Sequence, residues 1–565
     1  MSWPYAFTTL NDVQKAQRRE ALDRHGVYAQ LSALIPLLSV LLFRLASHLY
    51  ASAANREKGH EAGIGSPQRK AGKGGGAARG GRVWRKVNWW LGGEVARGWA
   101  KRKIWLAGGV WWCWLVVLCV RGTGDDYLHV TKRFGVVAAS QLPIHYMLSM
   151  KSPWSPLALI FKASHEELNP WHRLQGRIIY SLLCLHASFY LNFFVQAGLL
   201  KTRLTAPVVV AGWVVFLCLT TIVTTALEPV RRWSYRVFFV VHLIFGVIIL
   251  PMLFIHAEPL RLYVFEALML FIFDIVCRKL DTVTGFATVT PVPHTNLVRI
   301  QIPVPASKLK RFHAAPGQHV YLSIPAESTP PTTPAVSIHD LLFNPFTIAE
   351  VSSKAVTLVV RSLDGPTTKA LQHLSNLPKA KPPISIEGPL GSSRHFPDLT
   401  AQYDRILLIA GGVGATYILP LYEHLQDRLA TQGKSPDRIT FIWSLSHASE
   451  ASWAVDPTSR LRIDDDDSVR LHVTRSASSS QEESVLPGGD VELETLREEG
   501  VKASGGYERP DYRKIVDGVF RMGNEERVAV VVCGPAGMAR VVRGEVGRWV
   551  GKGRDVWFHD EAFGW

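Results

Sequence analysis

The chain has 565 residues, 47% of them hydrophobic, and a net charge of +16. This length allows several domains, and the apolar runs before residue 278 exclude a purely soluble protein. The positive charge does not indicate nucleic-acid binding, because it concentrates beside apolar runs, where membrane proteins carry it. The six cysteines predict no disulfide framework, since most of them lie within apolar runs.

Seven apolar segments are predicted to cross a membrane, with six as the alternative count. They occupy residues 28–50, 104–120, 134–150, 171–195, 207–227, 235–255 and 260–277. A helix needs about 20 residues to span the hydrocarbon core, so the ends of the shorter segments are approximate. Residues 1–27 are predicted to form a polar N-terminal tail outside the membrane. No cleavable signal peptide is expected, because the first apolar run is long enough to remain as a span.

The loop over residues 51–103 is strongly basic. It carries thirteen Lys and Arg residues against three Glu residues, which predicts a cytosolic location by the positive-inside rule. This topology places the N-terminus outside and the C-terminal half in the cytosol. Residues 51–81 have the composition of a flexible loop. Residues 82–105, rich in Trp and Arg, form either a segment on the membrane surface or a solvated loop.

Four histidines share one spacing in two predicted spans. His172 and His186 are fourteen residues apart, and so are His242 and His256. Fourteen residues is close to four helical turns, so each pair lies on one helix face, about 21 Å apart along the axis. Four unrelated polar residues would not explain this match, and ionisable residues in spans are usually functional. Both spans run outward in the predicted topology, so the helices are parallel and the histidines form two layers. Because imidazole is an axial ligand of haem iron, we expect two haems, one between His172 and His242 and one between His186 and His256.

Short strands and turns from residue 282 to about 395 predict a small antiparallel β-barrel. This segment contains Asn344-Pro345-Phe346-Thr347, followed by Arg361 and by Gly365-Pro366-Thr367-Thr368. An aromatic ring followed by a hydroxyl suits a flavin, with Phe346 stacked on the isoalloxazine and Thr347 near N5. Arg361 is a candidate partner of the flavin pyrophosphate. The alternative is a barrel turn followed by an ordinary exposed arginine.

Residues 400–565 have the strand and helix pattern of an α/β nucleotide-binding domain. Gly411, Gly412 and Gly414 follow a buried strand and open a helix, where backbone N–H groups approach a pyrophosphate. Cys533-Gly534-Pro535 follows another buried strand and is predicted to line the nicotinamide crevice. An insertion over about 446–510 is predicted to be mostly disordered, with one strand at 469–475. Its run Asp464–Asp467 indicates solvated charge rather than a metal site.

Together these motifs resemble those of the fungal ferric/cupric reductases, which are similar to the superoxide-producing NADPH oxidases. The resemblance covers about residues 134–565 and includes both histidine pairs, NPFTIA, GPLG, IAGGVGATYILP, VVCGPAGM and the terminal DEAFGW. It implies NADPH, FAD and two haem b groups as cofactors. It implies haem ligation by His172, His186, His242 and His256, FAD contacts at Phe346, Thr347, Arg361, Gly365 and Thr367, and nicotinamide-nucleotide contacts at Gly411, Gly412, Gly414, Cys533, Gly534 and Pro535. The predicted catalytic residues are Phe346, Thr347, Cys533 and Trp565, with Trp565 covering the flavin face until the nicotinamide displaces it.

The chain departs from the family pattern at three places. Asn344 stands where the family usually has His, which puts part of the FAD contact in doubt. Residues 443–447 lack the Arg that usually binds the 2′-phosphate, so the choice of NADPH over NADH is open, with Arg475 as a candidate substitute. The large secreted N-terminal region of many fungal relatives is also missing, which weakens the case for surface iron capture.

The expected protein is a multi-pass α-helical membrane domain followed by a cytosolic ferredoxin-reductase-like module, a β-barrel FAD domain and an α/β nucleotide domain. The expected function is electron transfer from cytosolic NADPH through FAD and two haems to an external acceptor, an Fe(III) chelate or Cu(II). The plasma membrane is the expected location, with an internal membrane as the alternative. Arginines expected to pair with haem propionates are Arg173, Arg177, Arg232 and Arg236 at the inner layer and Arg203 and Arg261 at the outer layer. The alternatives are an oxidase that reduces O₂ to superoxide and a non-catalytic membrane scaffold.

Overall fold

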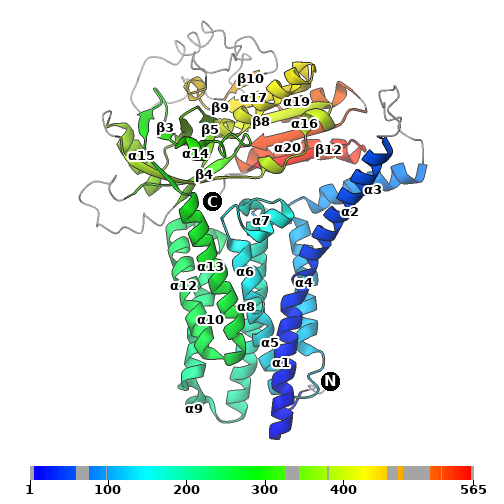
Figure 1. The fold of residues 1–565 in the computed structure, drawn as a ribbon, viewed down its shortest axis with the longest axis vertical. Helices are drawn as coiled ribbons and strands as arrows, with labels where there is room; N and C mark the ends of the chain where they lie inside the picture. Colours follow the sequence, from blue (N-terminus) through cyan, green and yellow to red (C-terminus); the bar gives the residue numbers. More distant parts are fainter. Residues whose placement is uncertain are drawn as a thin grey trace. The chain divides into compact units, whose positions relative to one another are not determined.

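The computed structural model describes residues 5–58, 75–96, 98–325, 343–377, 381–454, 469–474, 509–523 and 525–561. The chain forms two compact units (Figure 1). The helical unit is built from the segments before residue 75 and from residues 90–278. The second unit is built from residues 75–89 and from the chain after residue 278. Trp565, Arg475 and Asp464–Asp467 lie outside the described residues.

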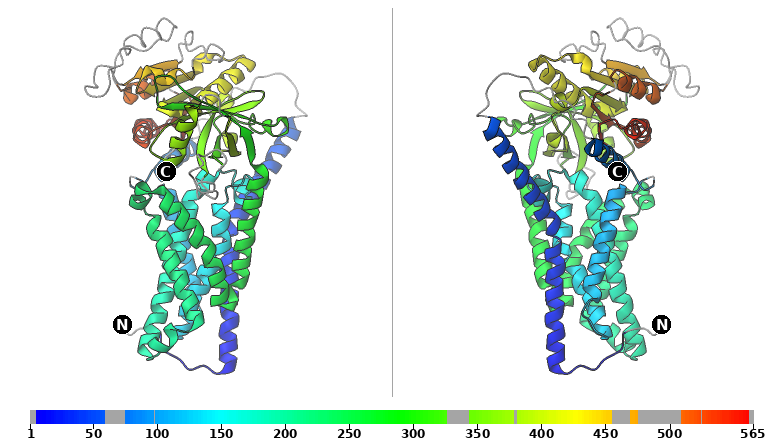
Figure 2. Two further views of the ribbon diagram at one scale, coloured as in Figure 1. Left: turned by 90° about the vertical axis from the view of Figure 1, so that its left-hand side faces the viewer. Right: turned by 90° about the vertical axis from the view of Figure 1, so that its right-hand side faces the viewer.

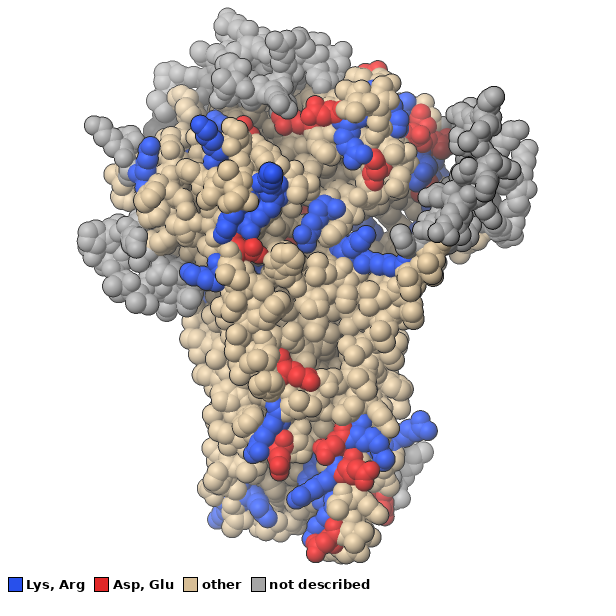
Figure 3. Space-filling view, viewed as in Figure 1, with Lys and Arg blue, Asp and Glu red and all other residues tan. Residues whose placement is uncertain are grey.

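In the helical unit, long helices lie side by side along a common direction (Figures 1 and 2). They are α1 (Asp12–Ser32), α2 (Ile35–Lys58), α4 (Arg102–Val120), α8 (His165–Gln196), α10 (Pro207–Thr225), α12 (Tyr235–His256) and α13 (Arg261–Asp281). Within the described residues, five helical segments are long and apolar enough to cross a membrane, at 12–47, 102–120, 165–196, 207–225 and 235–256. On the face shown in Figure 3, a broad band of this unit is almost free of charged side chains, as a surface against lipid requires.

The third predicted span differs from the sequence-based expectation, and the seventh is a single helix that is not among these five segments. Residues 134–150 do not form one helix, because α5 (Tyr127–Ala139) ends before α6 (Leu142–Ser149) begins, and Pro143 starts the new helix. Proline suits a first helical turn and is unfavourable inside a helix. The seventh segment is the helix α13, which carries three acidic residues, Glu266, Asp274 and Asp281. The buried carboxylate of Asp274 in α13 accepts hydrogen bonds from the backbone N–H groups of Lys151 and Ser152. These bonds compensate for the water that it loses on burial.

The predicted N-terminal tail is helical from Asp12 onward. Asn11 caps α1 in a capping box with Gln14, an arrangement that satisfies two free N–H groups. Small residues on one side of α1 permit close packing, because a side chain at Gly26 would collide with Tyr263 and Val136. Part of the predicted tail is therefore an ordered helix, and its location outside the membrane stays a prediction.

The basic loop is also more ordered than expected. Residues 51–58 continue α2, residues 59–74 lie outside the described residues, and α3 (Gly75–Leu91) follows. The Trp89 ring meets the Phe558 ring at 5.6 Å, and the Arg543 guanidinium lies 4.3 Å from the Trp89 ring centre. Residues 82–91 are therefore helical rather than a solvated loop, and Trp89 packs on the nucleotide-binding part of the second unit through aromatic and cation–π contacts. The location of residues 82–105 on a membrane surface stays a prediction.

The first part of the second unit is a closed antiparallel sheet. Its strands are β1 (Val283–Phe286), β2 (Thr288–Pro291), β3 (Leu297–Pro303), β4 (His319–Ser323), β5 (Asn344–Val351), β6 (Ala355–Arg361) and β7 (Pro383–Leu390), in the order β1-β7-β4-β5-β6-β3-β2. The edge strands β1 and β2 are consecutive in the chain, separated only by Ala287, so the chain closes the sheet into the predicted barrel. The helix α15 (Pro366–Ser375) follows β6.

The second part is a parallel sheet covered on both faces. Its strands are β8 (Arg405–Gly411), β9 (Ile439–Leu445), β10 (Val469–Val473), β11 (Val528–Cys533) and β12 (Val556–Glu561), in the order β10-β9-β8-β11-β12. One face packs on α17 (Ala415–Thr431), and the other on α19 (Tyr512–Arg521) and α20 (Ala536–Gly551). The chain order reverses beside β8, and ligands of such sheets bind at the carboxyl ends of the strands at that point. That location is where the predicted glycine turn lies.

Candidate functional site

The four histidines of the predicted spans come together as two pairs. His172 and His186 lie on α8, and His242 and His256 lie on α12. The ring centroids are 6.0 Å apart for His172 and His242, and 6.4 Å apart for His186 and His256. The helices therefore run parallel, and the pairing is the one that the spacing predicts.

The separation of the rings fits one iron between each pair. Metal–imidazole bonds of about 2 Å on both sides of one ion place the two ring centres about 6 Å apart. The chemistry of the donors fits as well, because neutral imidazole is a common axial ligand of haem. The helices α8 and α12 pack mainly on α5 and α10, respectively, so the imidazoles face each other across the space between the two ligand helices.

Backbone carbonyls hold three of the four rings. The Nδ1 atoms of His172, His186 and His256 lie 3.1, 2.8 and 2.7 Å from the carbonyl oxygens of His145, Thr131 and Val208. An Nδ1–H donated to a carbonyl leaves Nε2 free for a metal and fixes the ring. The Nδ1 atom of His242 is buried without a hydrogen-bond partner among the described residues. The fourth ring is thus held less firmly than the other three.

Two glycines make room for the second pair. A Cβ atom at Gly135 of α5 would lie 2.7 Å from Cε1 of His186, and one at Gly212 of α10 would lie 2.6 Å from Cε1 of His256. Real Cβ contacts are essentially never under 3.0 Å. The rings therefore press on helix backbone at positions where no side chain fits. Sequence reasoning missed both glycines, because a single glycine in an apolar span has many explanations.

A fifth histidine lies at the first pair. The His145 ring of α6 stacks on the His172 ring, with centroids 4.1 Å apart and an interplanar angle of 15°. Its Nδ1 atom is buried and has no hydrogen-bond partner in the part of the chain that the structure describes. The signal that singled out the other four, an ionisable residue in an apolar segment, was also present at His145.

The arginines expected to hold propionates contact protein groups in several cases. Arg177 lies over the Trp105 ring at 5.2 Å, and Arg261 lies over the Phe254 ring at 5.2 Å. Arg232 forms an ion pair with Glu228. Arg173, Arg203 and Arg236 are exposed. Their role towards propionates stays a prediction.

The predicted flavin residues lie at one edge of the barrel. Phe346 and Thr347 of β5 pair with Val320 and His319 of β4, and Thr347 is buried. Asn344 donates from Nδ2 to Oγ1 of Thr367 at 2.6 Å, which joins the two predicted FAD segments. Buried side-chain oxygens without a hydrogen-bond partner among the described residues, on Gln318, Ser392 and Ser393, provide polar contacts of the kind a flavin needs.

Arg361 is half-buried rather than an ordinary exposed arginine. Its Nη2 atom donates to Oε1 of Glu450 at 2.9 Å, and a Cβ atom at Gly412 would lie 3.1 Å from the same Nη2. Arg361 therefore extends from the barrel to the glycine turn after β8. That position suits an arginine that binds a phosphate group of a nucleotide.

The two predicted nucleotide turns interlock at the ends of β8 and β11. A Cβ atom at Gly414 would overlap the carbonyl oxygen of Cys533, and one at Gly411 would lie 2.8 Å from Cδ of Pro535. A Cβ atom at Gly534 would likewise lie only 3.0 Å from Cα of Gly411. Only glycine permits this approach. Burial raises the pKa of the Cys533 thiol well above its ordinary value, so this side chain is a neutral thiol at the crevice.

Trp443 lies in β9, at the start of the segment 443–447 that lacks the arginine of the family. Its side chain is fully buried, and its Nε1–H donates to the carbonyl oxygen of Gly412 at 3.0 Å. The Trp443 side chain therefore holds the glycine turn through this hydrogen bond. Its tryptophan identity has a structural reason that is independent of the 2′-phosphate.

Three family profiles match the chain in sequence. "Ferric reductase like transmembrane component" matches residues 134–253, "FAD-binding domain" matches 284–394, and "Ferric reductase NAD binding domain" matches 403–546. The second of these segments contains all of the antiparallel sheet except Val283, and the third contains most of the parallel sheet.

Curated relatives agree with these profiles. The chain is 25% identical over 358 residues to "Ferric reductase transmembrane component 1" of Schizosaccharomyces pombe, covering 56% of this chain and 59% of that protein. It is 23% identical over 490 residues to "Ferric/cupric reductase transmembrane component 2" of the same yeast, covering 76% and 80%. It is 24% identical over 363 residues to a superoxide-generating NADPH oxidase heavy chain of Dictyostelium discoideum, covering 58% and 64%. With the transmembrane component, the FAD-binding domain and the NAD-binding domain in this order, the chain belongs to the ferric reductase family.

Proposed function

We propose that this protein transfers electrons across a membrane, from NADPH on the cytosolic side to an Fe(III) chelate or Cu(II) on the other side. The proposal rests on two pairs of facing imidazoles in the helical unit. The ring centroids are 6.0 Å apart for His172 and His242 and 6.4 Å apart for His186 and His256. Each pair suits one iron, and the two pairs lie about four helical turns apart. The interlocked nucleotide turns of the second unit support a nicotinamide donor.

When bound, FAD and two haem b groups supply the redox chemistry, because a flavin accepts hydride and haem iron carries single electrons. His172 and His242 hold one haem in this proposal, and His186 and His256 hold the other. The residues that would hold FAD are Phe346, Thr347, Arg361, Gly365 and Thr367. Those that would hold the nicotinamide nucleotide are Gly411, Gly412, Gly414, Cys533, Gly534 and Pro535. Trp565 would cover the flavin face.

The residues around the imidazoles determine how the acceptor is reduced. The carbonyls of His145, Thr131 and Val208 fix three rings and make them better ligands. Because His172 with His242, and His186 with His256, would hold the iron from both sides, no position on it would remain for the acceptor. The acceptor then receives its electron without binding to iron, which suits a metal ion that arrives inside a chelate.

The direction of transfer follows from the charge of the loops. The basic loop over residues 51–103 is on the cytosolic side by the positive-inside rule. Because α8 and α12 run parallel, His172 and His242 then lie near the cytosolic face, and His186 and His256 near the outer face. NADPH is the proposed donor, with Arg475 as the candidate contact to its 2′-phosphate.

Superoxide production from O₂ is the second candidate. The similarity to the Dictyostelium oxidase heavy chain favours it, and the same imidazole pairs serve it. The two fungal relatives named as reductases favour the metal instead.

Sealed membrane vesicles that contain the protein distinguish the two candidates. NADPH is supplied on the side of the nucleotide domain, and a membrane-impermeant Fe(III) chelate and O₂ are supplied on the other. Metal reduction predicts Fe(II) formation that superoxide dismutase does not change. Fe(II) formation abolished by the dismutase would establish the oxidase, and no Fe(II) or superoxide in either case would refute transmembrane transfer.

A further inference from the structure

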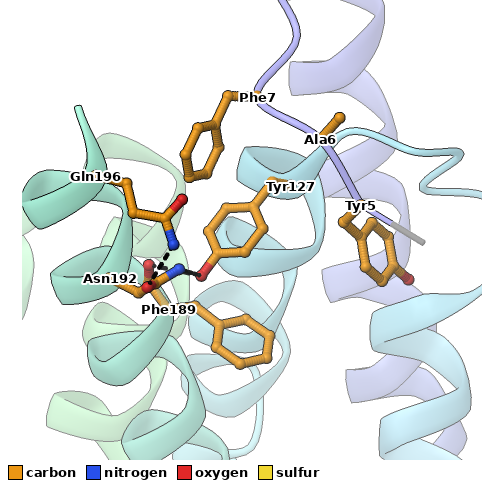
Figure 4. A pocket seen from close by; sticks show the side chains of 7 residues that line it. All are labelled: Tyr5, Ala6, Phe7, Tyr127, Phe189, Asn192 and Gln196. Carbon is orange, nitrogen blue, oxygen red and sulfur yellow. Dashed lines mark hydrogen bonds between the residues drawn. The ribbon is translucent and has the colours of Figure 1, made fainter. Parts of the chain in front are cut away.

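An open pocket of about 600 Å³ lies in the helical unit (Figure 4). Its walls come from three segments that are far apart in the sequence. They are Tyr5, Ala6 and Phe7 at the start of the chain, Tyr127 of α5, and Phe189, Asn192 and Gln196 of α8. The proposed function leaves this pocket unused.

The wall formed by the chain start is fixed in place. The Ala6 N–H donates to the carbonyl of Asp125 at 2.8 Å, and the Tyr127 N–H donates to the carbonyl of Ala6 at 3.0 Å. The Phe7 ring stands edge-on against Tyr127 and Phe193, with centroids 5.0 and 5.2 Å apart. Phe7 nevertheless remains 42% exposed. Residues 5–7 thus form an ordered wall of the pocket, and the Phe7 ring is partly exposed.

The pocket begins about one helical turn beyond the His186 ring. Phe189, Asn192 and Gln196 are three, six and ten residues after His186 on α8, or about 4.5, 9 and 15 Å along the axis. On α5, Tyr127 lies one turn before Thr131, the residue whose carbonyl is 2.8 Å from Nδ1 of His186. Two helices therefore lead from the second imidazole pair to the walls of the pocket.

The lining has a definite chemistry. Aromatic rings are supplied by Phe7, Tyr127 and Phe189, and no charged residue is among the lining residues. A chain of hydrogen bonds runs from Gln196 to Asn192 at 3.0 Å and from Asn192 to the Tyr127 hydroxyl at 2.9 Å. A side-chain amide has two N–H groups. Asn192 and Gln196 each use one of them in these hydrogen bonds, so the other is available to a ligand. Two charged side chains near the pocket, Arg18 and Asp126, form an ion pair of 3.0 Å.

We propose that this pocket binds the electron acceptor as an uncharged chelate with flat aromatic ligands. The ligand ring stacks on Phe7, and its oxygens accept hydrogen bonds from Asn192 and Gln196. This inference rests on the proposed function, and it specifies the acceptor. One electron converts Fe(III) of the chelate to Fe(II), and no bond to the protein forms or breaks. One NADPH supplies two electrons, so two chelates are reduced for each NADPH, which leaves NADP⁺ and one proton.

The test compares two chelates of opposite character. Fe(III) tris(maltolate) is neutral and aromatic, whereas Fe(III)–EDTA is anionic and has no aromatic ring. In Phe7→Ala and Asn192→Leu we expect KM for the maltolate chelate to rise about tenfold, the effect of one lost aromatic or polar contact. The kcat with the maltolate chelate and the kcat/KM with Fe(III)–EDTA stay unchanged. Leu191→Ala is the matched control, because Leu191 is an exposed residue of the same helix that does not line the pocket.

Binding is measured separately from turnover with Ga(III) tris(maltolate), which has the same shape and charge but is not reduced. Wild type and Leu191→Ala should bind it, and Phe7→Ala should bind it about tenfold more weakly. Equal binding by all variants, or equal loss of activity with both Fe(III) chelates, would overturn the pocket assignment. If wild type reduces neither chelate, the proposed function fails, and the gallium titration still tests the pocket.

Discussion

Gly135 and Gly212 are the residues whose replacement tests the second imidazole pair most simply. A methyl group at either position would collide with the ring of His186 or His256. We expect Gly135→Ala and Gly212→Ala each to displace one ring and to lower the haem content from two to about one per chain. Haem extraction and quantification on purified protein measure this content.

Gly246→Ala is the matched control for these two variants. Gly246 lies on α12, the helix of His242 and His256, and a Cβ atom there would have no neighbour within 4 Å. Its haem content should equal that of wild type. Full haem content in all three variants would mean that the glycines do not position the rings.

His145 acts on the first pair through its ring. His145→Leu removes the ring stacked on His172 but keeps the backbone carbonyl near Nδ1 of His172. We expect two haems to remain and one of the two low-spin electron paramagnetic resonance signals to shift, since the orientation of an axial imidazole affects that signal. The signal of the second pair is the internal reference. Two unchanged signals would leave His145 with a packing role only.

At the scale of residues, the sequence predicts side chains that recur at a regular interval along one helix. It does not predict side chains that meet only through contacts between helices. The two fourteen-residue intervals identified four histidines, because helical geometry converts an interval into a common face. Gly135, Gly212 and His145 meet those histidines across helices, so no local pattern contains them. Asn344 was recognised as a departure, but its hydrogen bond to Thr367 appears only in the fold.

Among the elements, the two nucleotide turns were predicted separately and are found interlocked. Gly414→Ala places a methyl group against the Cys533 carbonyl and should separate the ends of β8 and β11. We expect KM for NADPH to rise at least about tenfold, because the helix start that receives the pyrophosphate moves. Anaerobic flavin reduction by NADPH, followed in a stopped-flow instrument, measures this effect.

Gly518→Ala serves as the control for this variant. Gly518 lies inside α19, and a Cβ atom there would have no neighbour within 4 Å. Alanine in a helix interior should stabilise the domain by about 0.5–1 kcal/mol and leave NADPH binding unchanged. An equal KM in Gly414→Ala and Gly518→Ala would contradict the role of the interlocked turns.

The helix α3 supplies a second test at the scale of elements. Trp89→Ala removes the contacts with Phe558 and Arg543, and we expect a loss of about 1–2 kcal/mol in the stability of the nucleotide domain. Trp84 of the same helix is 66% exposed, so Trp84→Ala should have no effect. Thermal unfolding of the solubilised protein compares the two. Equal midpoints would mean that α3 does not stabilise the domain.

Elements whose local pattern agreed with their environment were predicted well, and the others were not. The strands and turns of the second unit follow period and glycine placement, so the barrel and the parallel sheet were both expected. The break between α5 and α6, the helical start of the chain and the docking of α3 depend on packing partners elsewhere. Composition described α1 as a polar tail because most of its residues face outward.

For the whole molecule, composition and order of motifs were sufficient to predict a membrane unit followed by a flavin and nicotinamide module. The count of seven spans was less certain, because α13 combines apolar residues with Glu266 and Asp274. The predicted orientation of the helical unit in the membrane rests on the basic loop over residues 51–103. The identity of the acceptor had no sequence signal, since the pocket is formed by segments about 120 and 60 residues apart.

The central claim is that two imidazole pairs hold two haems, and one measurement tests it directly. Haem content and the low-spin signals are recorded for wild type and for His172→Leu, His242→Leu, His186→Leu and His256→Leu. We predict two haems per chain in wild type and one in each variant. His172→Leu and His242→Leu should retain the same signal, and His186→Leu and His256→Leu should retain the other. A wild-type protein with fewer than two haems, or variants that group in any other way, would contradict the two-layer arrangement.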